Sequence, residues 1–174
     1  DPEYQAKYGM KSIEGRTVNI HGILKDIGDI YETHELVIET KTMPSEAWRK
    51  ALCFGWMLNL MHFNKLLQIP LLVANGVGKT TFSKLIEAIL EVDSDRFPTL
   101  VEIKNFLMDT ANRIQNGAPE YVHSENYLGI YWHVDEYLFI KLNKDCLLNQ
   151  FYSESRELFS DLVGERVPKD LLNQ

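Results

Sequence analysis

The feature that most constrains the fold of this chain is an apolar segment without one polar side chain, A-L-C-F-G-W-M-L at residues 51–58. In a helix, such a segment has no face suited to water, so neighbouring elements must enclose it on most sides. A membrane span would need roughly 20 consecutive apolar residues, but Arg49 and Lys50 precede the segment and Asn59 follows it. We therefore predict the core helix of a globular fold, with Trp56 as a core anchor.

The residues just before this segment indicate how the helix starts. The stretch L-V-I-E-T at residues 36–40 is short and rich in β-branched side chains, as in a strand. After it, Thr42 and Ser45 offer hydroxyl groups that can accept a free backbone N–H, and Pro44 is tolerated in a first helical turn. Glu46 suits the positive end of the helix dipole. These residues predict a strand followed by a capped helix start.

Apolar side chains recur at helical spacing in three later segments, which predicts three amphipathic helices. The three stripes are Phe82, Leu85, Ile86, Ile89 and Leu90; Leu100, Ile103, Leu107, Ala111 and Ile114; and Leu148, Phe151, Tyr152, Phe159 and Leu162. Weak alternation at residues 17–24 predicts a strand or an extended segment, followed by a linker near Gly28. Residues 127–142 fit either a hairpin or an extended segment before a helix capped by Asp135. The expected fold class is mainly α (α+β with minor β structure), an irregular helical bundle with a few short strands.

The loop before the first of these helices, G-V-G-K-T-T at residues 76–81, has the outline of a phosphate-binding loop. The pattern G-x-x-x-x-G-K-[ST] requires a Gly where this chain has Val73, and a branched side chain there resists the tight turn. The following elements are mostly helical, whereas a nucleotide-binding fold alternates strands and helices. We predict that Thr80 or Thr81 caps a helix. A divergent phosphate-loop NTPase that uses Lys79 is the enzymatic alternative.

Charge and cysteine content exclude several classes of function. The net charge is −7 and the Lys and Arg side chains form no stripe, which argues against nucleic acid as a partner. Cys53 and Cys146 are far apart, so we predict two reduced, buried thiols in a cytoplasmic protein. His21 has no Cys, Asp or His beside it at metal-binding spacing and is expected to be a surface residue. The carboxylates are scattered, and no catalytic constellation can be assembled from them.

Four stretches resemble the C-terminal region of cobalamin-dependent radical SAM enzymes. They are E-T-K-T-M-P-S-E-A-W at residues 39–48, F-G-W-M-L-N-L-M-H at 54–62, D-P-E-Y-Q-A-K-Y-G-M-K at 1–11, and Q-F-Y-S-E at 150–154. Pro44 stands where the family pattern has Ser. The cluster-binding pattern C-x-x-x-C-x-x-C and the cobalamin-binding pattern D-x-H-x-x-G do not occur in the sequence.

The resemblance implies that this chain is a non-catalytic accessory module that packs on a barrel and shapes substrate access. It also implies that the parent enzyme carries a [4Fe–4S] cluster, S-adenosylmethionine and cobalamin, and that this chain binds none of them. The partners would be the upstream radical SAM and cobalamin-binding domains of the same protein. The domain division expected is an N-terminal segment at residues 1–30 that continues from an upstream domain, a helical module at 31–168, and a tail at 169–174. A stand-alone helical interaction domain is the third hypothesis.

Five side chains are candidates for contacts with a neighbouring domain or substrate: Glu39, Thr40, Thr42, Trp48 and His62. The first three lie at the predicted junction of strand and helix, where their structural role would be to cap their own backbone. The structural role of Trp48 would be core packing. The imidazole of His62 suits the carbonyl end of the long helix.

Overall fold

A computed structural model describes residues 1–23 and 32–168 of the 174-residue chain. In the described residues, the elements are α1 Pro2–Tyr8, β1 Lys11–Arg16, β2 Thr33–Glu39, α2 Ser45–Leu58, η1 Asn59–Phe63, α3 Gln68–Gly76, α4 Phe82–Glu91, α5 Pro98–Gln115, β3 Val122–Ser124, β4 Ile130–Trp132, α6 Val134–Lys144, α7 Leu148–Val163 and η2 Gly164–Arg166. The predicted fold class is confirmed, because helices dominate and the strands form two antiparallel two-stranded sheets. The predicted linker near Gly28, the boundary at residues 30 and 31, and the tail at 169–174 lie outside the described residues.

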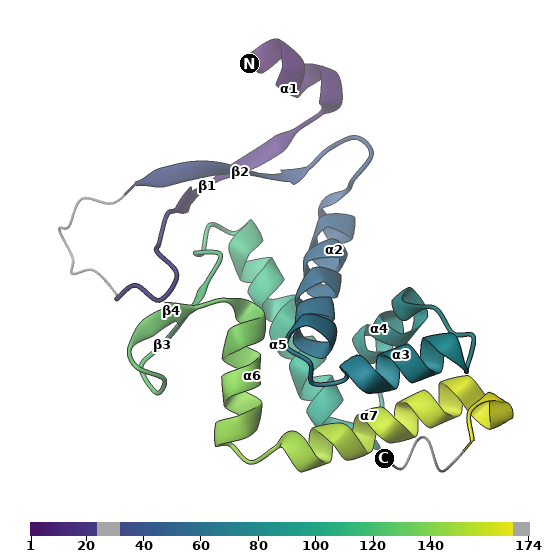
Figure 1. Cartoon of the computed structure of the whole chain (residues 1–174). Helices are drawn as coiled ribbons and strands as arrows, with labels where there is room; N and C mark the ends of the chain where they lie inside the picture. The colour runs from purple at the N-terminus through teal and green to yellow at the C-terminus, as the bar shows by residue number, and fades with distance from the viewer. Residues whose placement is uncertain (24–31, 169–174) are drawn as a thin grey trace.

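The core lies where α2, α4, α5 and α7 pack against one another, with α3 and α6 at its sides (Figure 1). Its fully buried side chains come from all of these helices and from η1, and include Met57, Leu60, Leu71, Leu85, Ile86, Leu100, Leu107, Leu138, Phe151 and Phe159. Many of these side chains belong to the three apolar stripes predicted from the sequence. Tyr152 was predicted as part of the third stripe, but its side chain is exposed, whereas that of the neighbouring Phe151 is fully buried.

The long apolar helix is less enclosed than predicted. Along α2 only Cys53 and Met57 are buried, Ala51 is exposed, and Trp56 is half-buried against the edge of the core. The prediction of Trp56 as a core anchor is therefore confirmed only in part. The apolar run continues into the π-helix η1, and this widened turn buries Leu60 and Met61. Short π-helical turns inside helices are often associated with functional positions.

The start of α2 differs from the prediction. The N-cap position is held by Pro44, and no side chain hydrogen-bonds to the free N–H groups of the first turn. The hydroxyl of Thr40 instead accepts a hydrogen bond from the backbone N–H of Met43 at 3.1 Å, inside the turn that precedes the helix. The Thr40 hydroxyl thus bonds to the backbone of the turn and not to the helix start. Thr side chains near a helix end can form either kind of bond.

The N-terminal strand pair forms an arm that extends away from the helical bundle, with α1 at its far end (Figure 1). Strand β1 pairs antiparallel with β2 from Lys11 opposite Glu39 to Arg16 opposite Thr33. The strand predicted at residues 36–40 is thus confirmed within β2. Of the two alternatives for residues 17–24, a strand or an extended segment, the strand is absent from the described residues 17–23: β1 ends at Arg16, and Ile23 forms a single bridge, to Ile130.

For residues 127–142, the alternative of an extended segment before a helix is confirmed. The alternative of a hairpin between residues 127–132 and 137–142 was wrong, because residues 137–142 lie in α6. Strand β4 pairs with β3 in a small hairpin, and α6 begins two residues later. The predicted cap was wrong, because His133 is the N-cap residue and Asp135 lies inside the first turn. Asp135 is buried, and its carboxylate accepts a hydrogen bond from the Asn64 side-chain amide at 2.9 Å. This bond ties α6 to the end of η1.

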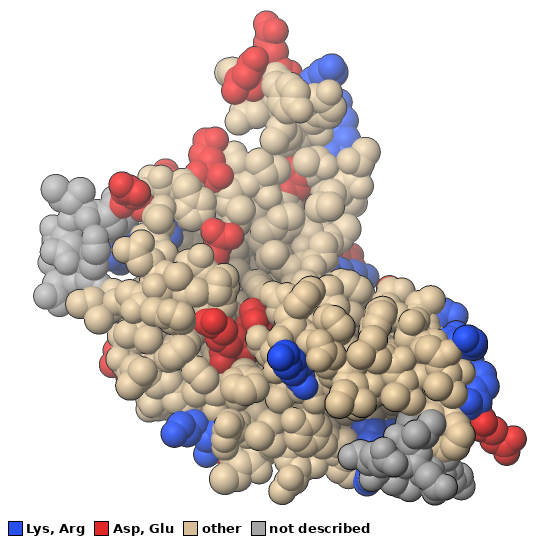
Figure 2. Space-filling view, viewed as in Figure 1, with Lys and Arg blue, Asp and Glu red and all other residues tan. Residues whose placement is uncertain are grey.

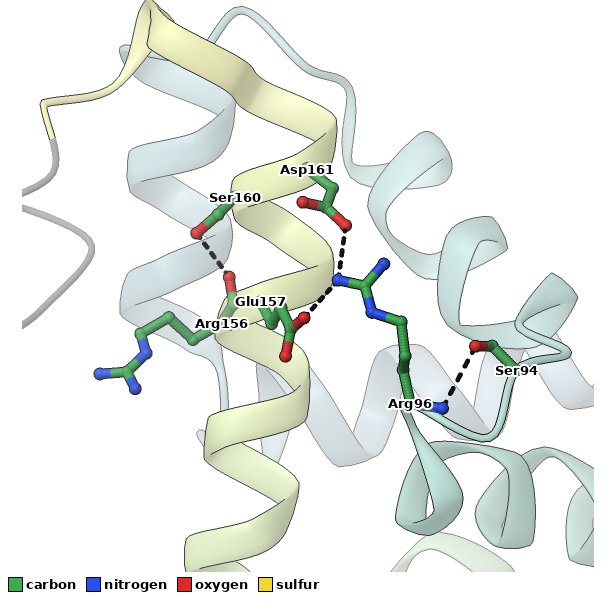
Figure 3. Close-up of polar contacts among 6 residues, drawn as sticks. All are labelled: Ser94, Arg96, Arg156, Glu157, Ser160 and Asp161. Carbon is green, nitrogen blue, oxygen red and sulfur yellow. Dashed lines mark hydrogen bonds and ion pairs between the residues drawn. The ribbon is translucent and has the colours of Figure 1, made fainter.

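Helix α7 is attached to the rest of the bundle by charged side chains. The buried Glu154 carboxylate accepts hydrogen bonds from the backbone N–H groups of Thr99 at 3.2 Å and Leu100 at 3.0 Å, at the start of α5. On the surface, the Arg96 guanidinium pairs with Glu157 and, at 3.3 Å, with Asp161 (Figure 3). The exposed ion pairs of Arg96 are of a kind that adds little stability. The hydrogen bonds to Glu154, in contrast, replace a missing N-cap at the start of α5.

The two cysteines differ, which corrects the prediction that both are buried. Cys53 is buried, and burial raises the pKa of its thiol to about 11. Cys146 is exposed at the turn between α6 and α7. In the described ranges, no helix combines the length and the apolar character needed to cross a bilayer.

Candidate functional site

The first three predicted contact residues lie in one turn at the base of the arm. Glu39 ends β2, and Thr40 and Thr42 follow it, with their hydroxyl oxygens 3.4 Å apart. Thr40 also accepts the N–H of Met43, so capping of its own backbone is confirmed for this residue. The side chain of Thr42 is exposed and that of Glu39 is half-buried. These three residues therefore lie in one turn at the surface of the protein.

The other two predicted residues lie apart from each other. Trp48 is half-buried in the first turns of α2, while His62 lies in η1. Fourteen helical residues at 1.5 Å each separate them by roughly 20 Å. The His62 ring contacts the rings of Phe63 and Phe82, and its buried Nδ1 atom has no hydrogen-bond partner. The five predicted residues do not form a single site.

The glycine-containing loop joins two helices. The apolar run that precedes it belongs to α3, whereas a phosphate-binding loop follows a strand. A Cβ atom at Gly78 would lie 2.6 Å from the Ala74 carbonyl oxygen, so close packing explains this glycine. Lys79 donates to the Gly76 carbonyl oxygen at 2.8 Å, and Thr81 accepts the N–H of Lys84 at 3.3 Å as the N-cap of α4. The predicted Thr81 cap is confirmed.

A nucleotide titration tests the role of this loop. We expect no saturable heat on calorimetric titration with ATP and Mg²⁺, because the N–H groups of Val77, Gly78 and Thr80 donate to carbonyl groups of α3 and the Lys79 ammonium group donates to the Gly76 carbonyl oxygen. We expect Lys79→Ala to leave stability nearly unchanged, while the Thr80→Ala, Thr81→Ala double variant loses about 1 kcal/mol of unfolding free energy. Saturable micromolar binding that disappears in Lys79→Ala would instead establish the NTPase alternative.

The structure forms a pocket of about 340 Å³ where η1, β4 and α6 meet the segment that follows β1. Its walls are formed by His21, Asn64, Trp132, Glu136, Phe139 and Ile140. Figure 2 shows acidic side chains over the start of α6, within a mostly uncharged surface. The first turn of α6 carries two acidic residues, the buried Asp135 and the half-buried Glu136. Pockets that combine apolar walls with a few polar groups are the usual form of small-molecule sites.

His21 occupies one side of this pocket. Its Nε2 atom lies 3.1 Å from Oε2 of Glu136, and its ring meets the Trp132 ring edge-on with 5.0 Å between centroids. The backbone of His21 has φ +58°, a left-handed conformation that is uncommon for residues other than Gly. Its N–H donates to the Tyr131 carbonyl oxygen at 2.7 Å, which holds the residue in place. The fold therefore fixes an imidazole against a carboxylate and an indole.

Sequence reasoning missed this pocket. His21 was expected on the surface without a role, and Asn64, Trp132 and Glu136 were not singled out. The only local signal is the run I-Y-W-H-V-D-E at residues 130–136, which places an aromatic strand directly before an acidic helix start. Nothing local indicates that His21 and Asn64 join it, because His21 lies 115 residues from its partner Glu136.

A second group of exposed side chains is apolar. On the arm, Tyr4 and Tyr8 of α1 are exposed, and their rings lie 4.5 Å apart. On the bundle, Ile69 and Leu72 of α3 and the adjoining Phe63 are exposed, at 72%, 52% and 65%. The surface over α3 in Figure 2 is largely uncharged. Exposed apolar clusters of this kind often mark contacts with other proteins or domains.

Comparisons with known proteins add no family to this description. No protein-family model matches the chain, and no curated protein matches it. Among the described residues, no group of three His, Cys, Asp or Glu side chains is placed to hold a metal ion. The geometry of the pocket, the arm and the α3 surface therefore carries the functional argument.

Proposed function

We propose that this chain is a non-catalytic accessory module of a cobalamin-dependent radical SAM enzyme, and that it docks on the catalytic barrel through its N-terminal arm. The cluster, S-adenosylmethionine and cobalamin would be bound by the other domains of the parent enzyme. This module would shape access of the substrate to the barrel. The proposed compartment is the cytoplasm, where the exposed free thiol of Cys146 suits reducing conditions.

The observation that carries the proposal is that α1 buries none of its side chains. Helices shorter than about 12 residues are marginal in water without tertiary packing, and α1 has 7 residues. It is capped by Asp1 and Gly9, and the Lys41 side chain donates to the Lys7 carbonyl oxygen at 2.8 Å. Caps and polar contacts with Lys41 do not replace an apolar partner surface.

The arm also brings two of the resembling stretches together. Residues 1–11 form α1 and the start of β1, while residues 39–48 form the turn and the start of α2. The N–H of Lys41 donates to the Tyr8 carbonyl oxygen at 2.9 Å, which joins the two stretches. This places the predicted contact residues Glu39, Thr40 and Thr42 beside the arm. Two of the four resembling stretches thus meet at the arm, while the other two, residues 54–62 and 150–154, lie in the packed helices.

The test uses the protein together with whatever coding sequence precedes Asp1. We expect a C-x-x-x-C-x-x-C pattern upstream, and we expect the α1 amides to exchange at least about tenfold more slowly in the longer protein than in this chain. In the longer protein, the Tyr4→Ala, Tyr8→Ala double variant should lose this protection. Tyr152→Ala, which also removes an exposed aromatic ring, is the matched control and should not.

A stand-alone interaction domain is the second candidate, favoured by the exposed Phe63, Ile69 and Leu72. It predicts no cluster pattern upstream and equal exchange of α1 in both proteins. Either of these results would refute the radical SAM proposal.

A further inference from the structure

We propose that the pocket formed by His21, Asn64, Trp132, Glu136, Phe139 and Ile140 is a binding site for a small organic cation. Without a ligand, the imidazole of His21 occupies the position beside the Glu136 carboxylate that the ligand's ammonium group would take. The inference is independent of the docking proposal, since it concerns a different part of the molecule. It rests on the composition of the pocket walls, on the position of His21 within them, and on the size of the cavity.

The walls favour a cation over an anion or a neutral molecule. Glu136 is the one carboxylate that lines the pocket, and no Lys or Arg lines it among the described residues. The buried Asp135 carboxylate, which accepts a hydrogen bond from the lining residue Asn64 at 2.9 Å, adds a further acidic group next to the pocket. Trp132 and Phe139 provide aromatic surface, and ring faces attract cations. A carboxylate beside aromatic rings is the combination that recognises ammonium groups.

The contacts of His21 show how the pocket can hold a nitrogen-containing group between a carboxylate and an aromatic ring. Its ring nitrogen lies 3.1 Å from the Glu136 carboxylate, and its ring forms an edge-type contact with the Trp132 indole, with 5.0 Å between centroids. Half of the His21 side chain is exposed, so a ligand can reach and displace it. Exposed pairs of this kind contribute little to stability, and the displacement therefore costs little. The indole N–H of Trp132 is fixed by a 2.9 Å bond to the Tyr127 carbonyl oxygen, so the aromatic wall keeps its orientation.

The chain offers a matched pair without a pocket. His34 and Glu120 form the same type of contact, at 3.2 Å and with similar exposure. Neither residue lines the cavity. A cation attracted only by surface carboxylates would not distinguish Glu120 from Glu136, whereas a ligand of the pocket depends on Glu136 alone.

The experiment is a two-dimensional ¹H–¹⁵N NMR titration of the chain with three probes of the same shape: phenethylammonium, phenylacetate and 2-phenylethanol. We expect saturable shifts with phenethylammonium at a Kd on the order of 1 mM, as suits a fragment. The shifts should include the Trp132 indole N–H, assigned with Trp132→Phe. We expect at least about tenfold weaker binding of phenylacetate and 2-phenylethanol, equivalent to about 1.4 kcal/mol.

Three variants, each checked for a folded spectrum, decide the roles. Glu136→Gln should weaken phenethylammonium binding at least about tenfold, and Glu120→Gln should leave it unchanged. His21→Ala should preserve or tighten binding, because the carboxylate loses its internal partner. Absence of saturable shifts up to about 20 mM, equal binding of phenylacetate, equal effects of the two Gln variants, or loss of binding in His21→Ala would each overturn the proposal.

Discussion

Replacing Phe151 with Ala is expected to lower the free energy of unfolding by about 3–5 kcal/mol, through lost burial and the cavity left behind. Phe151 has no exposed surface and lies in the core cluster formed with the other helices. The effect should be measured by urea denaturation, with the change read from the midpoint at a constant slope.

The neighbouring residue provides the control for this prediction. Tyr152 follows Phe151 on α7 and has a ring of similar size, but it is 41% exposed. Tyr152→Ala should therefore cost much less than Phe151→Ala. Comparable losses in the two variants would mean that α7 is rotated about its axis relative to the core described here.

The second large effect is expected for Glu154→Ala, at about 2–3 kcal/mol, because two backbone N–H groups at the start of α5 would lose their acceptor inside the protein. The N-cap residue of α5, Phe97, offers no side-chain acceptor, so Glu154 performs this role from α7. Glu154→Gln keeps one acceptor oxygen and should recover part of the loss. Thermal or urea unfolding of the two variants measures the difference.

Glu157→Ala is the matched control, since Glu157 lies one turn along the same helix and pairs with the exposed Arg96 (Figure 3). Its effect should be much smaller and should decrease further with added salt, because exposed pairs are screened. If Glu157→Ala were as destabilising as Glu154→Ala, the capping role of Glu154 would be refuted.

The elements that the sequence predicted well are those set by neighbours along the chain. The helices α4 and α5 follow the predicted apolar stripes, and the Thr81 cap needs only the N–H three residues later. The strand within β2 followed from its β-branched run. These patterns depend on residues within one or two turns of the chain, so the elements can be predicted without knowledge of the fold.

The elements that the sequence missed depend on distant partners. Strand β1, K-S-I-E-G-R, has little β character of its own and exists because β2 supplies its hydrogen bonds. Helix α3, which carries the run P-L-L-V-A before the glycine-containing loop, was not predicted either, since five apolar residues do not distinguish a helix from a strand. Cys146 was expected inside, but its place in a turn leaves it exposed.

At the candidate sites, residue types and local spacing were enough to predict the turn of Glu39, Thr40 and Thr42. The contacts of Glu154 with a helix start 54 and 55 residues away, and of His21 with Glu136, arise only when distant elements pack together. The physical reason is that spacing along a helix or strand fixes which side chains share a face, whereas packing of whole elements decides which faces meet. A pocket between elements therefore depends on how whole elements pack, and the spacing of residues along the chain does not reveal it.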